Sequence, residues 1–226
     1  PHGIWIDRRP GLDEKVVICD RAHGTLQLLT LEGKYLETIK GYGMPANVDT
    51  WKNLLLVPEL HARVTLLNEK NEVVAHLGDD VEGVVKKKKV SRGNAKTWVD
   101  GKFVHPHDAC FGANGDIYVA DCFNDRVEMF NAEGHYISSF RGDASLSRVA
   151  RTYMLTNAIS NRLRETGRIE QEKYLRRPRS VRIDSEFRLF IPDYETYRVQ
   201  IYQKDFIPLD ETQFAAPLRN PTLEVT

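Results

Sequence analysis

Residues 105–140 contain the stretch that decides the fold, HPHDACFGANGDIYVADCFNDRVEMFNAEGHYISSF. Apolar and polar residues alternate between short turns, and Asn114-Gly115 is a dipeptide that favours the positive φ angles of a tight hairpin. Alternation with a period of two, in segments such as Ile117–Asp121 and Tyr136–Phe140, predicts antiparallel strands. This stretch therefore predicts one four-stranded antiparallel sheet.

The same pattern recurs in three other parts of the chain. Each copy opens with a proline near its start, and an acidic residue ends its second strand, at Asp20, Glu59, Asp121 and Asp193. Four strands in about 40 residues, repeated along a chain, are typical of the blades of a β-propeller. The predicted fold is thus all-β, with a single propeller domain whose blades are residues 1–43, 44–80, 103–142 and 176–205.

Two insertions and a tail interrupt or follow this period. Residues 81–102 are polar and predict a loop between blades. Within residues 143–175, apolar side chains such as Leu146 and Val149 fall near helical spacing, so we expect one or two helices there. The tail, residues 206–226, contains three prolines and is expected to run across a sheet edge, with Thr222–Val225 as a short closing strand.

The composition excludes some broad classes of protein. The 226 residues carry 32 basic and 32 acidic side chains, so bulk charge gives no argument for binding nucleic acid or membranes. No apolar run approaches the eighteen or so residues of a membrane-spanning helix, and no leader is visible before Pro1, where we expect a processed or trimmed end. These features predict no particular cellular compartment. Three cysteines without metal-like spacing, Cys19, Cys110 and Cys122, predict core thiols.

Two stretches resemble a known repeat. PHDACFGANGDIYVADCFNDRVEMFNAEGHYISSF and RPRSVRIDSEFRLFIPDYETYRVQIYQ are similar to NHL repeats. This resemblance implies an NHL-type propeller, a ring that usually has five or six blades, of which four are visible here. Because Pro1 coincides with the first strand of a blade, we expect the ring to be open on its N-terminal side.

The two halves of the chain resemble different groups. The first half, through PHDACF, resembles the peptidyl-α-hydroxyglycine α-amidating lyase (peptidylamidoglycolate lyase) family. The second half, with FRGDASLSR and RPRSV around the helical insert, resembles another NHL-repeat group. A natural recombinant, an engineered fusion and a composite sequence would each produce this combination.

Candidate site residues follow the opening proline of each blade. In a propeller the first strands line the central channel, and the residues at this position are His2, Ala46, His107 and Arg179. Neutral imidazoles from two blades are suited to hold Zn²⁺ if a third ligand is present, with Asp108 as an orienting or acid–base group. The alternative is structural: each imidazole hydrogen-bonds at the channel mouth. Arg179 is a candidate for binding substrate.

The lyase resemblance adds roles for particular residues. That family cleaves peptidyl-α-hydroxyglycine to an amidated peptide and glyoxylate, using a zinc held by three histidines. Pro1-His2-Gly3 and Pro106-His107-Asp108 match two of its motifs, and Cys19-Asp20-Arg21 matches a third segment, which implies a catalytic and substrate-binding role for Arg21. The family's third histidine would fall upstream of Pro1, and its catalytic tyrosine has no match.

Three functions follow in order of preference. The first is a scaffold that binds a protein or peptide on a loop-rich face, and the alternative is a zinc-dependent lyase in an active, truncated or inactive form. RNA binding through the basic run Lys86–Lys89 and the arginines of residues 148–182 ranks third. For either of the first two, a second copy or a partner subunit could complete the open ring.

Overall fold

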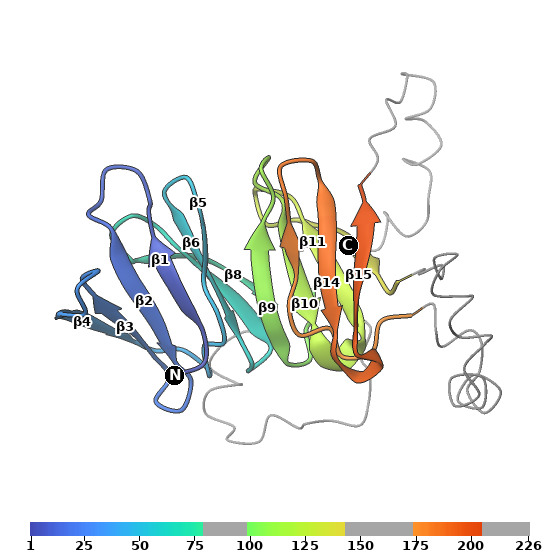
Figure 1. Cartoon of the computed structure of the whole chain (residues 1–226), viewed down its shortest axis with the longest axis horizontal. Helices are drawn as coiled ribbons and strands as arrows, with labels where there is room; N and C mark the ends of the chain where they lie inside the picture. Colours follow the sequence, from blue (N-terminus) through green and yellow to red (C-terminus); the bar gives the residue numbers. More distant parts are fainter. Residues whose placement is uncertain (79–98, 143–173, 205–226) are drawn as a thin grey trace.

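The computed structural model describes residues 1–78, 99–142 and 174–204, which form four antiparallel sheets (Figure 1). Blade 1 contains β1 (Ile4–Asp7), β2 (Lys15–Asp20), β3 (Thr25–Leu29) and β4 (Tyr35–Lys40). Blade 2 contains β5 (Asp49–Trp51), β6 (Leu54–Glu59), β7 (Arg63–Leu67) and β8 (Val73–Gly78). Blade 3 contains β9 (Pro106–Phe111), β10 (Ile117–Asp121), β11 (Arg126–Phe130) and β12 (Tyr136–Phe140). Blade 4 contains β13 (Arg182–Ile183), β14 (Arg188–Asp193) and β15 (Arg198–Gln203).

The sheets are arranged as the blades of a β-propeller, as the sequence predicts. Within each sheet the strands pair in chain order, and Figure 1 shows the sheets side by side in the same order. The first strands of successive blades contact one another: β1 contacts β5, β5 contacts β9, and β9 contacts β13. The described part of blade 4 has three strands, and the position of a fourth, after Lys204, lies outside the described residues.

The core lies between the blades. Alternate residues of the middle strands, such as Val17 and Leu26 of blade 1, point towards the next blade and are fully buried against residues such as Val57. Similar clusters join blades 2 and 3 and blades 3 and 4. Each fully buried aliphatic side chain contributes about 1.5–3 kcal/mol, so packing between blades is a main source of stability. The three cysteines are buried free thiols, as predicted.

The acidic residue that ends each second strand binds an arginine in three of the blades. Glu59 pairs with Arg63 at 2.6 Å, Asp121 with Arg126 at 2.9 Å, and Asp193 with Arg198 at 3.3 Å. The same carboxylates also accept main-chain N–H groups from the segment that leads into the blade, at Gly43, Val104 and Arg176. Acidic side chains at such corners commonly accept main-chain N–H groups of the turn that follows, and Asp20 does so from the amide of His23. In blades 2 to 4 the carboxylate also holds, by these hydrogen bonds, the segment that precedes the first strand of its blade.

Several sequence predictions lie outside the described residues. These are the helical insert of residues 143–175 except its last two residues, most of the polar loop of residues 81–102, and the tail of residues 206–226. Among the residues that the structure describes, no helix has the length and apolar character needed to cross a membrane.

Candidate functional site

His2 and His107 meet at one end of the inner strands. His2 precedes β1 and His107 is the second residue of β9, so the two come from blades 1 and 3. Their ring centroids lie 5.0 Å apart, with the ring planes tilted by 54°. Two imidazoles that bind one tetrahedral zinc through bonds of about 2.0 Å also have centroids roughly 5 Å apart. The predicted pair therefore exists, at a spacing that suits a shared metal ion.

Each imidazole has one nitrogen committed to the main chain of the next blade. The Nδ1 atom of His2 lies 2.6 Å from the carbonyl oxygen of Ala46, and His107 makes a hydrogen bond with the main chain of Arg179. Burial lowers the pKa of His107 to about 4, and the nearby His2 and Arg179 act in the same direction. His107 is therefore neutral at pH 7, with one ring nitrogen remaining for a ligand. The same contacts also fit the alternative interpretation, in which each imidazole only hydrogen-bonds at the mouth of the channel.

The rim around this pair contains aromatic and cationic groups. The Arg179 guanidinium carbon lies 3.6 Å from the ring centroid of Tyr194, a cation–π contact, and Arg179 is exposed. On the other side, the ring of His105 stacks on Phe123 at 4.6 Å and lies 6.1 Å from the ring of His107. Neither His105 nor Tyr194 is among the site residues that the sequence predicts. The arrangement can hold a polar ligand between imidazole, guanidinium and aromatic faces.

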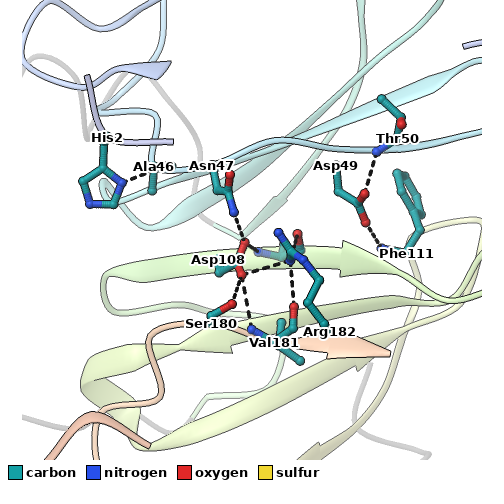
Figure 2. Close-up of polar contacts among 11 residues, drawn as sticks. His2, Ala46, Asn47, Asp49, Thr50, Asp108, Phe111, Ser180, Val181 and Arg182 are labelled. Atoms are coloured by element: carbon teal, nitrogen blue, oxygen red, sulfur yellow. Dashed lines mark hydrogen bonds and ion pairs between the residues drawn. The ribbon is translucent and has the colours of Figure 1, made fainter. Parts of the chain in front are cut away.

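Asp108, the predicted acid–base residue, is buried and surrounded by donors (Figure 2). One of its oxygens accepts hydrogen bonds from the Asn47 amide and its own neighbour's N–H, both at 2.9 Å. The other accepts from Ser180 Oγ at 2.5 Å, the Val181 N–H at 3.2 Å and the Arg182 guanidinium at 2.9 Å. The carboxylate thus joins three blades. This geometry favours a positioning role, and the catalytic role of Asp108 stays a prediction.

Asn47, Asp108 and Ser180 occupy the same position in successive blades, each two residues after the opening proline of its blade. The corresponding residue of blade 1 is Gly3, where a Cβ atom would lie 2.5 Å from the Ala46 carbonyl oxygen. Glycine is needed there because the main chain at Gly3 lies so close to the main chain at Ala46 and Asn47. These four residues form one continuous line of contacts across the described blades, which we call the inner line. Aligning the repeats residue by residue would have found it.

Arg21 lies at the same end of blade 1 as His2. The amide of His2 donates to the carbonyl of Cys19 at 2.8 Å, and Arg21 follows two residues later. The Arg21 side chain is exposed, and in the part of the chain that the structure describes it makes no hydrogen bond or ion pair. The neighbouring Asp20 instead contacts His23, whose hydrogen bond lowers the pKa of Asp20. The predicted substrate-binding and catalytic roles of Arg21 stay predictions.

The described residues contain the two predicted zinc ligands, His2 and His107, and no complete set of metal ligands. Across residues 1–78, 99–142 and 174–204, no group of three His, Cys, Asp or Glu side chains is placed to hold a metal ion. The donor chemistry at His2 and His107 fits two zinc ligands, and a third would have to come from elsewhere. The basic run proposed for RNA, Lys86–Lys89, lies outside the described residues.

Known proteins resemble this chain in fold. No protein-family model matches it, and no curated protein matches it. A catalytically inactive variant of virginiamycin B lyase from Staphylococcus aureus, solved with quinupristin, is 10% identical with a TM-score of 0.53 over 90% of this chain and 55% of that one. A streptogramin B lyase is 13% identical with a TM-score of 0.51 over 90% and 54%.

A third solved structure comes from a different kind of protein. An auxiliary nutrient-binding protein from Bacteroides thetaiotaomicron is 14% identical, with a TM-score of 0.54 over 88% of this chain and 46% of that one. The chain therefore spans about half the length of these three structures. At such low identity the similarity shows the fold alone. The fold of this chain is that of a β-propeller.

Proposed function

We propose that this chain is a peptide- or protein-binding β-propeller that holds its ligand at the rim formed by His2, His107, Arg179 and Tyr194. The observation that carries the proposal is the convergence of these side chains from three blades. Arg179 is exposed and is fixed over Tyr194, and none of its contacts in the described residues is with a carboxylate. A fixed guanidinium of this kind recognises carboxylates. A peptide carboxylate is the ligand group that fits best.

The proposal is tested with fluorescein-labelled hexapeptides that carry either a free C-terminal carboxylate or an amide. We expect the carboxylate series to bind more tightly, and Arg179→Ala to weaken that binding about tenfold, since a charged hydrogen bond contributes about 1.5–3 kcal/mol. Arg8→Ala is the matched control, because Arg8 is an exposed arginine whose contact is with Glu14. Equal binding of both series, or equal loss in both variants, would contradict the proposal.

A zinc-dependent lyase of the peptidyl-α-hydroxyglycine amidating type is the second candidate. It is favoured by the 5.0 Å separation of the His2 and His107 rings and by the neutral state of His107, which a metal ligand requires. His2 and His107 would hold the zinc, which would polarise a substrate oxygen. Arg179, and Arg21 by resemblance, would bind the substrate carboxylate. We also propose, from the resemblance of the repeats, that the propeller is of the NHL type.

Metal analysis separates the two candidates. About one zinc per chain, lost in His2→Ala and in His107→Ala, would favour the lyase and justify an assay for glyoxylate release from a peptidyl-α-hydroxyglycine. His23→Ala is the control, since His23 is an exposed histidine paired with Asp20. A protein that stays metal-free after dialysis against zinc would exclude the lyase and leave the peptide-binding propeller.

A further inference from the structure

Blade 4 has a third strand whose outer edge is not paired within the described residues. In blades 1 to 3 a fourth strand pairs with the third, as β4 with β3, β8 with β7 and β12 with β11. In blade 4 the described strands end at β15. A strand edge with unpaired N–H and C=O groups can pair with another chain.

The register shows which main-chain groups of β15 face this edge. Pro192 of β14 is opposite Val199, and the Pro192 carbonyl accepts the Arg179 N–H on the β13 side. In antiparallel sheets, the N–H and C=O of one residue point to the same side, and this side alternates along the strand. Val199, Ile201 and Gln203 therefore direct their main-chain groups away from β14. Consistently, the amide of Lys204 points back and donates to Phe187 at 3.0 Å.

Two apolar side chains of β15 are also exposed to solvent. The residues that correspond to Val199 in the other blades are Leu26, Val64 and Val127, and each is 0% exposed. Val199 is 56% exposed and Ile201 is 58% exposed. In blades 1 to 3 the corresponding residue lies opposite an apolar residue of the fourth strand: Ile39, Leu77 or Phe140. The exposure of Val199 thus includes the loss of this cross-strand partner.

The three existing fourth strands define what would fit this edge. Each begins with a Tyr or Val residue and has Ile, Leu or Phe at its fifth position, at Ile39, Leu77 and Phe140. Each also begins after a five-residue connection from the third strand, such as residues 30–34. Tyr202 of β15 corresponds to Leu29, the last residue of β3, and the same spacing after Tyr202 leads to Pro208, with Thr212 at the fifth position. This part of the chain's own sequence lacks the apolar residue that the position requires.

We propose that the outer edge of β15 binds an extended peptide from another polypeptide as the fourth strand of blade 4. The peptide adds antiparallel to β15, exchanges main-chain hydrogen bonds with Val199 and Ile201, and places an aliphatic or aromatic side chain opposite Val199. Such a peptide has an aromatic or β-branched first residue and no proline within its five or six residues. This site lies on the outer edge of blade 4 and goes beyond the proposed function, which places its ligand at the rim.

The probe is a synthetic peptide with the sequence of residues 135–142, HYISSFRG, which contains the β12 strand. Binding to the full chain is followed by isothermal titration and by amide hydrogen exchange. We expect the amides of Val199, Ile201 and Gln203 to exchange rapidly in the free protein and at least tenfold more slowly when the peptide is bound. N-methylation at the positions copied from Ser138 and Phe140 should abolish binding, whereas N-methylation at those copied from Ile137 and Ser139 should not.

Variants of the protein complete the test. Ile201→Pro removes an edge N–H that makes no hydrogen bond to β14, so it should leave the blade folded and abolish binding. Ile201→Val is the matched control and should bind as the wild type does. His2→Ala changes a rim residue that precedes β1 in blade 1, so it should also bind this peptide normally. A failure at the rim and a failure at β15 are therefore distinguishable. Slow exchange of the three amides in the free protein, as its own tail or a second copy would cause, would overturn the proposal. So would binding that is unaffected by N-methylation.

Discussion

The Asp49 carboxylate of blade 2 accepts the main-chain N–H of Phe111 in blade 3 at 2.7 Å (Figure 2). The Asp108 carboxylate of blade 3 accepts the N–H of Val181 in blade 4 in a similar way. In both cases a side chain on the inner strand of one blade holds the inner strand of the next. Burial raises the pKa of Asp49, so this contact is made in a site shielded from water. The blades are joined by polar contacts near the axis and by apolar packing farther out.

Asp108→Ala should destabilise the protein by about 3 kcal/mol, because removing this buried carboxylate leaves the donors around it without their acceptor. Its five hydrogen bonds join blades 2, 3 and 4. For a chain of this size, thermal unfolding should shift down by roughly 6–12 °C. Asp20→Ala removes a carboxylate whose contact is with the exposed His23, and should leave the stability nearly unchanged. Equal shifts in both variants would remove the positioning role of Asp108.

Arg126→Ala should cost more stability than Arg198→Ala, although the two arginines occupy the same position in blades 3 and 4. The Arg126 side chain is 1% exposed, and its guanidinium also binds the carbonyls of Val99 and Lys102. The Arg198 side chain is 25% exposed and its contact with Asp193 is longer. We expect losses of about 3–5 kcal/mol for Arg126 and about 1 kcal/mol for Arg198, measured by urea unfolding. The reverse order would show that burial does not set the strength of this pair.

Glu128→Gln should stabilise the protein at alkaline pH. Burial raises the pKa of Glu128 to about 8, and the carboxylates of Asp121 and Asp100 add to this, while Arg126 opposes it. In blades 2 and 4 the corresponding residues, Thr65 and Gln200, donate to the acidic residue of their own blade. A protonated Glu128 can act as such a donor.

The direction of this pH effect follows from proton linkage. Because the folded pKa of Glu128 lies above the unfolded value of 4.5, its contribution is complete below pH 4.5 and is lost as the pH rises towards 8. Glu128→Gln should therefore be more stable than the wild type by roughly 2–4 kcal/mol at pH 8.5, with the difference shrinking towards pH 4.5. Urea unfolding at a series of pH values measures it. A difference that does not vary with pH would contradict the prediction.

His107→Asn should reduce the loss of stability in acid. The folded pKa of about 4 lies below the unfolded value of 6.5, so wild-type stability falls as the pH drops from 6.5 to 4, by at most about 3 kcal/mol. Thermal unfolding between pH 7 and pH 4 should show a shallower decline in His107→Asn than in the wild type. His135→Asn, at an exposed loop position, should decline as the wild type does. Parallel curves for all three proteins would refute the prediction.

Much of the fold could be predicted from the sequence because the repeats carry their own signals. The segment Ile117–Asp121 is a strand with the predicted bounds, and β6 ends at Glu59 as predicted, since alternation and an acidic end mark both. The left-handed φ of 92° at Gly115 matches its place in the predicted hairpin. The meeting of His2 with His107 could be predicted as well, because equivalent positions of a propeller converge on one rim.

The partners of these residues could not be predicted, because they depend on distances between blades. The sequence marks Asp108 as the residue after His107, yet four of its five donors come from positions 61 to 74 residues away in the chain. The same holds for Arg179, whose contact with Tyr194 depends on the turn that follows β14. Glu128 could be recognised as unusual only by comparing it with Thr65 and Gln200 across the repeats.

The inner line also has a consequence for how the protein unfolds. Repeat proteins whose units contact only their neighbours can lose terminal units one at a time. Here Asp108 is hydrogen-bonded both to Asn47 in the preceding blade and to Ser180 in the following one, so opening blade 3 breaks polar contacts on both sides at once. The carboxylate couples three sheets whose apolar contacts are pairwise. Blades 2, 3 and 4 should therefore melt in a single cooperative transition.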